Sequence, residues 1–195
     1  FAEKSALQLV GNRYRLNVRQ QRAVQGMSVG KHLKTLRVKK EITVKSLQNQ
    51  ELILDGFNVL ILLESALSGA YLFKGLDGCY RDLSSVYGTY KKVKQTDKAI
   101  HLVADFLETH QVKHTTWVFD KPVSNSGRLK TMLREIAEEK KYNWNIILDH
   151  NPDKILAESP KIAVSSDAWI LDRASRWFNM VGHIIRHHIK QNNNI

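Results

Sequence analysis

Four aspartates in this sequence stand at the end of a short apolar run or a few residues after one. They are Asp55, Asp120, Asp149 and Asp167. If the runs are parallel strands of one sheet, their carboxyl ends lie along the same edge, so the four carboxylates would meet there. Carboxylates held close together repel one another, which raises their pKa values unless a cation neutralises them. Because hard oxygen ligands select Mg²⁺ or Mn²⁺, this arrangement predicts a divalent-metal site.

The elements that must position these aspartates begin at residue 51, where short apolar runs start to alternate with helical segments. The runs are 52–62, 115–120, 144–149, 161–167 and the less regular 180–185. The segments with a helical pattern are 78–94, 97–110, 126–141 and 168–178. Nearly continuous apolar strands that alternate with helices are typical of a parallel sheet covered on both faces. The sequence therefore predicts an α/β fold with three layers, α/β/α, around a mainly parallel central sheet.

Basic residues are concentrated near the N-terminus. The chain carries 30 Lys and Arg against 19 Asp and Glu, a net charge of +11. Residues 1–45 hold eleven of the basic and two of the acidic residues, which leaves 19 and 17 for the rest of the chain. A basic segment beside a nearly neutral body suits an anionic partner, either nucleic acid or lipid headgroups. The alternative is a solvated helix face whose arginine stems cover apolar surface.

The predicted domain organisation follows this change in composition. In residues 5–25 apolar side chains recur at steps of three to five residues with basic residues between them, which predicts an amphipathic helix. These apolar residues are Leu7, Val10, Tyr14 and Val18, with Ala23 as a further candidate. We expect a basic helical N-terminal extension at 1–48, an α/β domain at 49–190 and a disordered tail at 191–195.

Eight basic residues are candidates for binding the nucleic-acid backbone, four in the extension and four near the predicted site. They are Arg13, Arg15, Arg19, Arg22, Arg81, Lys121, Arg128 and Lys130. Arg128 and Lys130 follow the loop 124–127 at the start of a predicted helix, where backbone N–H groups could bind a phosphate. The alternative is ordinary surface charge.

Three of the aspartates also have a purely structural explanation. Asp55-Gly56 between apolar runs is a hairpin-turn signal, although the flanking residues do not alternate polar and apolar as the strands of a half-exposed hairpin do. Asp120 could open the Lys-Pro turn that follows it, and one of residues 165–167 could cap the next helix. The recurrence of aspartates at strand ends favours a functional site.

Three segments resemble the acidic motifs of PIN-like nucleases, especially those of the NYN branch. The segments are LDGFN (54–58), WVFDKP (117–122) and VSSDAWILD (164–172). They occur in the order that this superfamily has, and the resemblance covers roughly residues 50–185. Two further segments, DGCYRD (77–82) and LVGNRYRL (9–16), resemble an uncharacterised microbial family with a PIN-like domain.

This resemblance implies metal-dependent endonucleolytic cleavage, most often of RNA, on a three-layer fold. By position in the motifs, Asp55, Asp120 and Asp167 would ligate Mg²⁺ or Mn²⁺ directly or through water. Asn58 would brace Asp55 or contact the phosphate, and Ser166 would be the small polar neighbour of the last aspartate. Hydrolysis would leave 5′-phosphate and 3′-hydroxyl ends.

The superfamily usually supplies a fourth acid, and its identity here is open. The candidates are Asp77, Asp82, Asp149 and Asp172. We favour Asp82, which could lie on a helix face toward the site, and then Asp149, which ends a predicted strand.

Composition excludes several other classes of protein. Cys79 is the only cysteine, so the chain has no internal disulfide and no thiolate-rich zinc site, and a cytoplasmic location is expected. No run reaches the ~18 apolar residues that a membrane-spanning helix needs. His183 and His187 could bind a metal only on a helix, in a segment that looks partly like a strand, so no zinc site is expected there.

Two rival interpretations remain. The first is a non-catalytic nucleic-acid-binding or adaptor protein with a degenerate PIN-like site. The second is a phosphohydrolase of the haloacid dehalogenase type, which needs a second Asp two residues after the first. Phe57 and Pro122 occupy those places, so this interpretation ranks last. Whether the chain forms a homodimer or binds a partner protein is left open.

Overall fold

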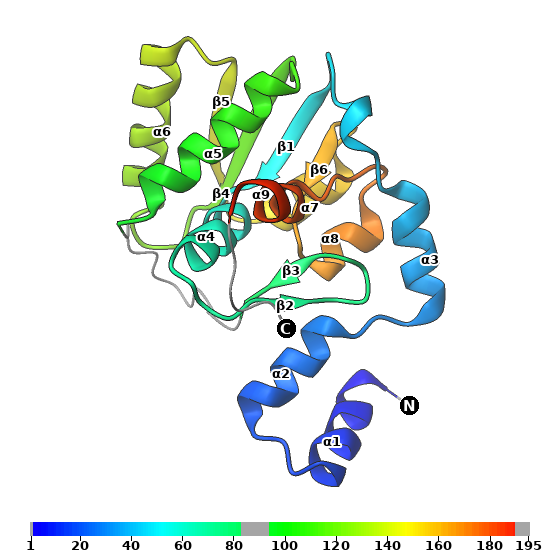
Figure 1. Ribbon diagram of the computed structural model, residues 1–195. Coiled ribbons are helices and arrows are strands. Elements are labelled where there is room, and N and C mark those ends of the chain that lie inside the picture. The colour runs from blue at the N-terminus through cyan, green and yellow to red at the C-terminus, as the bar shows by residue number, and fades with distance from the viewer. Residues whose placement is uncertain (1, 83–93, 190–195) are drawn as a thin grey trace.

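A parallel four-stranded sheet forms the centre of the structure, a computed structural model that describes residues 2–82 and 94–189 (Figure 1). Its strands are β1 (Glu51–Asp55), β4 (His114–Asp120), β5 (Trp144–Asp149) and β6 (Ile162–Val164). They lie in the order β5-β4-β1-β6, and each neighbouring pair is parallel. The predicted mainly parallel sheet is confirmed, and the strands all end at the same edge.

Helices cover both faces of this sheet. One layer contains α4 (Gly56–Leu67), α5 (Thr96–Thr109), α6 (Ser126–Lys140) and α9 (Met180–His188). The other contains α7 (Pro152–Glu158) and α8 (Ala168–Arg173). Successive residues of β1 point to opposite layers, since Leu52 and Leu54 join the core beneath the first set of helices and Ile53 joins the core beneath the second. The predicted α/β/α architecture is confirmed.

The first predicted strand is too long, because 52–62 contains both a strand and a helix. Strand β1 ends at Asp55, and α4 begins at Gly56. Helix α4 is buried on most sides between the sheet, α5 and α9, and its residues from Val59 to Leu63 are all apolar, so this part of the sequence shows no alternation of polar and apolar faces. A continuous apolar run does not distinguish a buried strand from a buried helix.

The predicted strand at 180–185 is wrong for a similar reason. These residues belong to α9, whose N-terminus is capped by the Asn179 side chain, which accepts a hydrogen bond from the Gly182 backbone N–H. The buried residues of α9 include Val181, Ile184 and Ile185, which form one helix face against the core. The cap and this face were the signals of a helix.

Two predicted helices have different bounds in the structure. The segment 78–94 begins with a strand, since β3 (Tyr80–Arg81) pairs antiparallel with β2 (Phe73–Lys74), and its residues 83–93 lie outside the described part of the chain. The segment 168–178 is helical only as far as Arg173. Trp177, beyond that point, makes backbone hydrogen bonds to Lys40 and Ile42 instead of continuing the helix.

The N-terminal extension contains three helices, α1 (Glu3–Arg13), α2 (Val18–Met27) and α3 (Lys31–Lys40), and a short 3-10 helix, η1 (Val44–Ser46), follows them. The single helix predicted at 5–25 is therefore divided. Arg15 has a φ of 51°, and Asn17 forms a capping box with Gln20 that starts α2. The predicted apolar face also stays largely in solvent, because Tyr14 and Val18 are 69% and 66% exposed. The tail predicted at 191–195 lies outside the described residues.

None of the helices within 2–82 and 94–189 is long and apolar enough to cross a membrane.

A candidate metal and phosphate site at the acidic edge

The carboxyl edge of the sheet brings the predicted aspartates to one region. Asp55, Asp120 and Asp149 are the last residues of β1, β4 and β5, and Asp120 pairs with Asp149 in the parallel register. Asp167 lies three residues after the end of β6, in the loop that leads into α8. Four acids that are far apart in sequence therefore line one edge, as their placement after strands predicts.

Asp55 starts the helix that follows it instead of opening a hairpin turn. Its Oδ1 accepts a hydrogen bond of 3.3 Å from the Asn58 backbone N–H, which caps α4. Gly56 is required by a close approach, because a Cβ at this position would clash with the ring of the buried Phe119 on β4. The Asp-Gly pair thus allows α4 to begin directly at the sheet edge while the carboxylate stays there.

The first and third acidic motifs are joined by hydrogen bonds. Ser165 Oγ donates to Asp55 Oδ2 at 2.8 Å, and the Asp167 backbone N–H donates to Ser165 Oγ at 3.0 Å. The Ser166 backbone N–H donates to Asn58 Oδ1 at 2.8 Å. Asn58 therefore braces the loop of residues 165–167 with its side chain and Asp55 with its backbone.

Asp167 also has the capping role that its position before a helix suggested. Its Oδ1 accepts hydrogen bonds from the backbone N–H groups of Trp169 and Ile170, at 2.7 and 3.3 Å. A capping carboxylate is fixed in orientation, and its Oδ2 is the oxygen that could contact a ligand. Capping and ligand binding are thus compatible at this residue.

The electrostatic environment raises the pKa of Asp55 to about 7. Burial is the main cause, and the negative charges of Asp153 and Asp167 add to it, while the hydrogen bonds from Ser165 and Asn58 act in the opposite direction. A carboxylate whose pKa is raised by burial and by neighbouring negative charges marks a candidate functional site.

Asp153 is a member of this acidic group that the sequence prediction missed. Burial raises its pKa, and so do the charges of Asp167 and Asp120. It lies in the first turn of α7, which Asn151 caps and Pro152 begins. The signal that could have identified it is the Asn-Pro-Asp sequence two residues after the strand-ending Asp149, since Asn and Pro mark a helix start.

Asp120 supplies a buried oxygen that lacks a partner. Within the described residues, no group donates a hydrogen bond to its buried Oδ1. The turn after β4 is closed by the Asp120 carbonyl oxygen, which accepts from the Val123 N–H at 3.3 Å, so the turn does not need the carboxylate. A buried carboxylate oxygen without a donor is costly, and a cation would offset that cost.

The four candidates for a fourth acid lie in different environments. Asp77 and Asp172 are held in ion pairs with Arg37, at 2.6 Å each. Asp149 Oδ1 accepts a hydrogen bond of 2.8 Å from the Asn151 backbone N–H, next to the edge. Asp82 follows β3, and its Oδ2 accepts from Ser65 Oγ at 3.3 Å.

The donor set fits a hard cation in its chemistry. In the described part of the chain, however, no three His, Cys, Asp or Glu side chains lie close enough together to hold one ion. A cation here would be held by one or two carboxylates and complete its shell with water. Mg²⁺ commonly binds in this way because it dehydrates reluctantly.

A groove of about 1100 Å³ runs from the acidic edge toward the N-terminal extension. At one end it is lined by Asn58, Asp82, Ser166 and Asp167. Its other wall comes from α1, α2 and α3, and the apolar residues in this wall include Leu7, Val24 and Leu33. The extension therefore borders the site as well as carrying charge.

The basic residues predicted to contact nucleic acid occupy three settings. Arg13, Arg15, Arg19 and Arg22 are exposed on the extension. Lys121 and Arg128 are exposed beyond the end of β4, and Lys130 is half-buried on α6. Arg81 points inward, where it pairs with Asp77 at 2.7 Å and donates to the Ser166 carbonyl oxygen.

Three of the histidines, His110, His183 and His187, form a separate group on the opposite side of the sheet from α7 and α8. His183 and His187 lie on α9 with ring centroids 4.4 Å apart, and His110 lies 5.8 Å from His183. Burial lowers the pKa of His183 to about 4, and the neighbouring histidines add to this effect.

The parallel sheet and its two helical layers define an α/β protein, and aspartates line the carboxyl edge of its sheet. The chain belongs to the family described as Domain of unknown function (DUF5616), whose model matches residues 44–183. Residues 1–40 match a second family, described as Protein of unknown function (DUF434).

One curated relative is Uncharacterized protein MJ0935 of Methanocaldococcus jannaschii. It is 30% identical over 172 residues, which cover 88% of this chain and 81% of the relative. The matched length exceeds that of the α/β domain, so the similarity extends into the N-terminal extension. No solved structure matches the chain.

Proposed function

We propose that this protein is a divalent-metal-dependent endoribonuclease that hydrolyses RNA phosphodiester bonds at the acidic edge. The observation that carries the proposal is the convergence there of Asp55, Asp120 and Asp167, together with the Asp120 oxygen that has no donor among the described residues and the raised pKa of Asp55. The resemblance of the same three segments to the acidic motifs of PIN-like nucleases supports it.

In the proposed mechanism the chain holds the cation and the phosphate in fixed positions. Asp120 Oδ1 and the Asp55 carboxylate would bind Mg²⁺ or Mn²⁺, and Asp167 Oδ2 would contact it through water. Ser165 keeps Asp55 oriented, since its hydroxyl donates to Oδ2. The bound cation would supply a Lewis acid that activates water and offsets charge on the phosphoryl oxygens. Asp82 or Asp153 could serve as a further acid.

The charge distribution supports a nucleic-acid substrate. The acids lie in the nearly neutral body, whereas residues 1–45 carry most of the net positive charge and form the other wall of the groove. Arginine and lysine contacts to phosphates give sequence-independent affinity that weakens with salt.

The proposal includes a cytoplasmic location. The single cysteine supports it, because a chain with one cysteine has no internal disulfide, and disulfides are rare in cytosolic proteins.

A second candidate function is a non-catalytic RNA-binding or adaptor protein. One observation favours it, namely that no three acidic or histidine ligands in the described residues surround a common point. The exposed Leu9, Tyr14 and Val18 of the extension would suit either a partner protein or a second copy of the chain.

Cleavage assays separate these functions. Single-stranded and structured RNA are incubated with the wild type, Asp55→Asn and Asp167→Asn in Mg²⁺, Mn²⁺ or EDTA. Asp105→Asn, on the exposed side of α5, is the matched control. We expect cleavage by the wild type and the control in either metal, and a loss of about 100-fold or more in the two site variants.

Two outcomes would decide against the nuclease. Cleavage that persists in both site variants, or in EDTA, would show that the acidic edge does not perform the reaction. Salt-sensitive RNA binding without cleavage by any variant in any metal would support the binding or adaptor function instead.

A further inference from the structure

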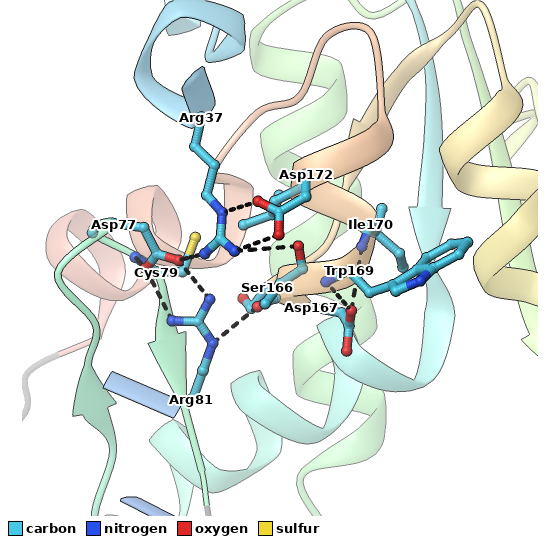
Figure 2. Close-up of polar contacts among 12 residues, drawn as sticks. Arg37, Asp77, Cys79, Arg81, Ser166, Asp167, Trp169, Ile170 and Asp172 are labelled. Carbon is cyan, nitrogen blue, oxygen red and sulfur yellow. Dashed lines mark hydrogen bonds and ion pairs between the residues drawn. The ribbon is translucent and has the colours of Figure 1, made fainter. Parts of the chain in front are cut away.

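A largely buried network of two arginines and two aspartates joins the N-terminal extension to the acidic edge (Figure 2). Arg37 of α3 is only 3% exposed, and it pairs with both Asp77 and Asp172 at 2.6 Å. Asp77, between β2 and β3, also receives two hydrogen bonds from Arg81, at 2.9 and 2.7 Å. Two cations and two anions thus neutralise one another at the wall of the groove, where Arg37 and Asp77 are buried and Arg81 and Asp172 are partly buried.

This network holds both ends of α8, the helix that Asp167 caps. At the start of the helix, Arg81 Nε donates to the Ser166 carbonyl oxygen at 3.0 Å, and Arg37 Nη2 donates to that of Ala168 at 3.4 Å. At its last turn, Arg37 donates to the Asp172 carboxylate at 2.6 and 3.0 Å. The peptide group immediately before Asp167 is therefore fixed by an arginine.

The loop between β2 and β3 is shaped to place Asp77 in this network. A Cβ at Gly75 would clash with Arg81 Nη1, and Gly78 has a φ of +84°, a conformation that favours glycine. The Cys79 backbone N–H also donates to Asp77 Oδ1 at 3.2 Å. With these bonds and Arg81, the surroundings keep the pKa of Asp77 below its ordinary value despite burial.

A network of this kind contributes little net stability to the fold. Burying charged groups costs desolvation energy, and well-packed apolar residues of similar volume often give a fold of equal or greater stability. Paired arginines and carboxylates do, however, fix geometry, because the planar guanidinium binds a carboxylate in one orientation. Because the network contacts the loop that contains Asp167, its fixed geometry can hold the backbone next to Asp167 in one position.

We propose that Arg81 is a positioning residue for Asp167, and that Arg37 of the N-terminal extension holds Arg81 in place through Asp77. The proposal rests on the nuclease function proposed above and deepens it. The extension then has two roles, since it attracts the substrate and also completes the support of the acidic edge. Removing either arginine would leave the aspartate present but loosely placed.

The test uses Arg81→Lys and Arg37→Lys, which keep the positive charge but lose the planar fork. Arg134→Lys, on the exposed side of α6, is the matched control. For each protein we measure Mn²⁺ affinity by titration calorimetry, and kcat and KM for RNA cleavage. Supporting partners of metal ligands usually change affinity or activity by about 10–100-fold. We expect a loss of at least ~10-fold in Mn²⁺ affinity and kcat for both variants, with KM nearly unchanged.

The outcomes separate this proposal from the proposed function. If the wild type neither binds Mn²⁺ nor cleaves RNA, the nuclease function fails and the positioning role fails with it. If the wild type does both, and Arg81→Lys keeps its Mn²⁺ affinity and kcat, only the positioning role is overturned. A rise in KM with unchanged kcat would overturn it too, because Arg81 would then act by binding the substrate.

Folding is checked by circular dichroism, and activity is compared at a temperature at which every protein is folded. If Arg81→Lys is unfolded at every temperature, Arg81→Gln takes its place. Failure of both to fold would show that the network serves stability alone, and this result too would overturn the positioning role.

Discussion

The raised pKa of Asp55 predicts an unusual dependence of stability on pH in the metal-free protein. Its pKa rises from an ordinary value of 3.8 to about 7 in the folded chain. A folded state that holds this proton more tightly than the unfolded state becomes less stable as the pH rises between these two values. Asp55→Asn removes the titration. The single side-chain oxygen of the asparagine can still cap α4, and its NH2 group can donate to Ser165 Oγ in place of the hydrogen bond that Asp55 accepts.

The magnitude follows from the two pKa values. From about pH 5 to about pH 8, ionisation of Asp55 would reduce the free energy of unfolding by about 2 to 3 kcal/mol. This figure is an upper limit, because the carboxylate is partly exposed and solvent screens it. The Asp55→Asn variant should lack this decrease, so its stability relative to the wild type should increase with pH.

The assay is urea unfolding in EDTA at both pH values, for the wild type, Asp55→Asn and the control Asp105→Asn. Saturating Mg²⁺ should remove most of the wild type's loss of stability at high pH, since a cation stabilises the ionised carboxylate. If the stability of the wild type and of Asp55→Asn depends on pH in the same way in EDTA, the raised pKa of Asp55 is refuted. If Mg²⁺ has no effect on wild-type stability, binding of the cation by the ionised Asp55 is refuted.

Three further predictions concern other parts of the molecule. Gly56→Ala should lower the free energy of unfolding by about 1–3 kcal/mol in urea titrations, because its Cβ would clash with Phe119. The lowered pKa of His183 means that the wild type loses stability as the pH falls below ~6.5 toward ~4, and His183→Gln should lack this loss in thermal melts. Changing four arginines of the extension to glutamine should weaken RNA binding and flatten its dependence on salt concentration, measured by fluorescence anisotropy. The four are Arg13, Arg15, Arg19 and Arg22. Unchanged salt dependence would show that the extension does not contact the phosphates. An unchanged free energy of unfolding in Gly56→Ala would contradict the first prediction, and a loss of stability at low pH in His183→Gln equal to that of the wild type would contradict the second.

The sheet was predictable because its strands carry a strong local signal. Strands β1, β4, β5 and β6 are short apolar runs. Each ends in an aspartate or has one shortly after it, and each precedes a helix, so their parallel arrangement and shared edge follow from general rules. The boundary between β1 and α4 was not predictable from periodicity, because both elements are buried and apolar. Here the Asp55 carboxylate, which caps the Asn58 backbone N–H, and the close packing of Gly56 determine the boundary.

The parts of the candidate site that depend on tertiary contacts were not predicted. Asp153 belongs to the acidic group only because α7 begins at the sheet edge, and α7 is too short for a clear helical pattern. Arg37 looks like any other residue of the basic extension, yet it is one of the most buried charged groups in the described chain. Its partners Asp77 and Asp172 are 40 and 135 residues away in sequence.

The most direct test of the central claim is cleavage of RNA that carries sulfur in place of a non-bridging oxygen at the scissile phosphate. Mg²⁺ binds sulfur poorly, whereas the softer Mn²⁺ accepts it. If the acidic edge holds a cation against the phosphate, this substitution should slow cleavage in Mg²⁺ by about 10-fold or more, and Mn²⁺ should restore most of the rate. Equal rates for both substrates in Mg²⁺, or equal slowing in the two metals, would contradict contact between the cation and the phosphate.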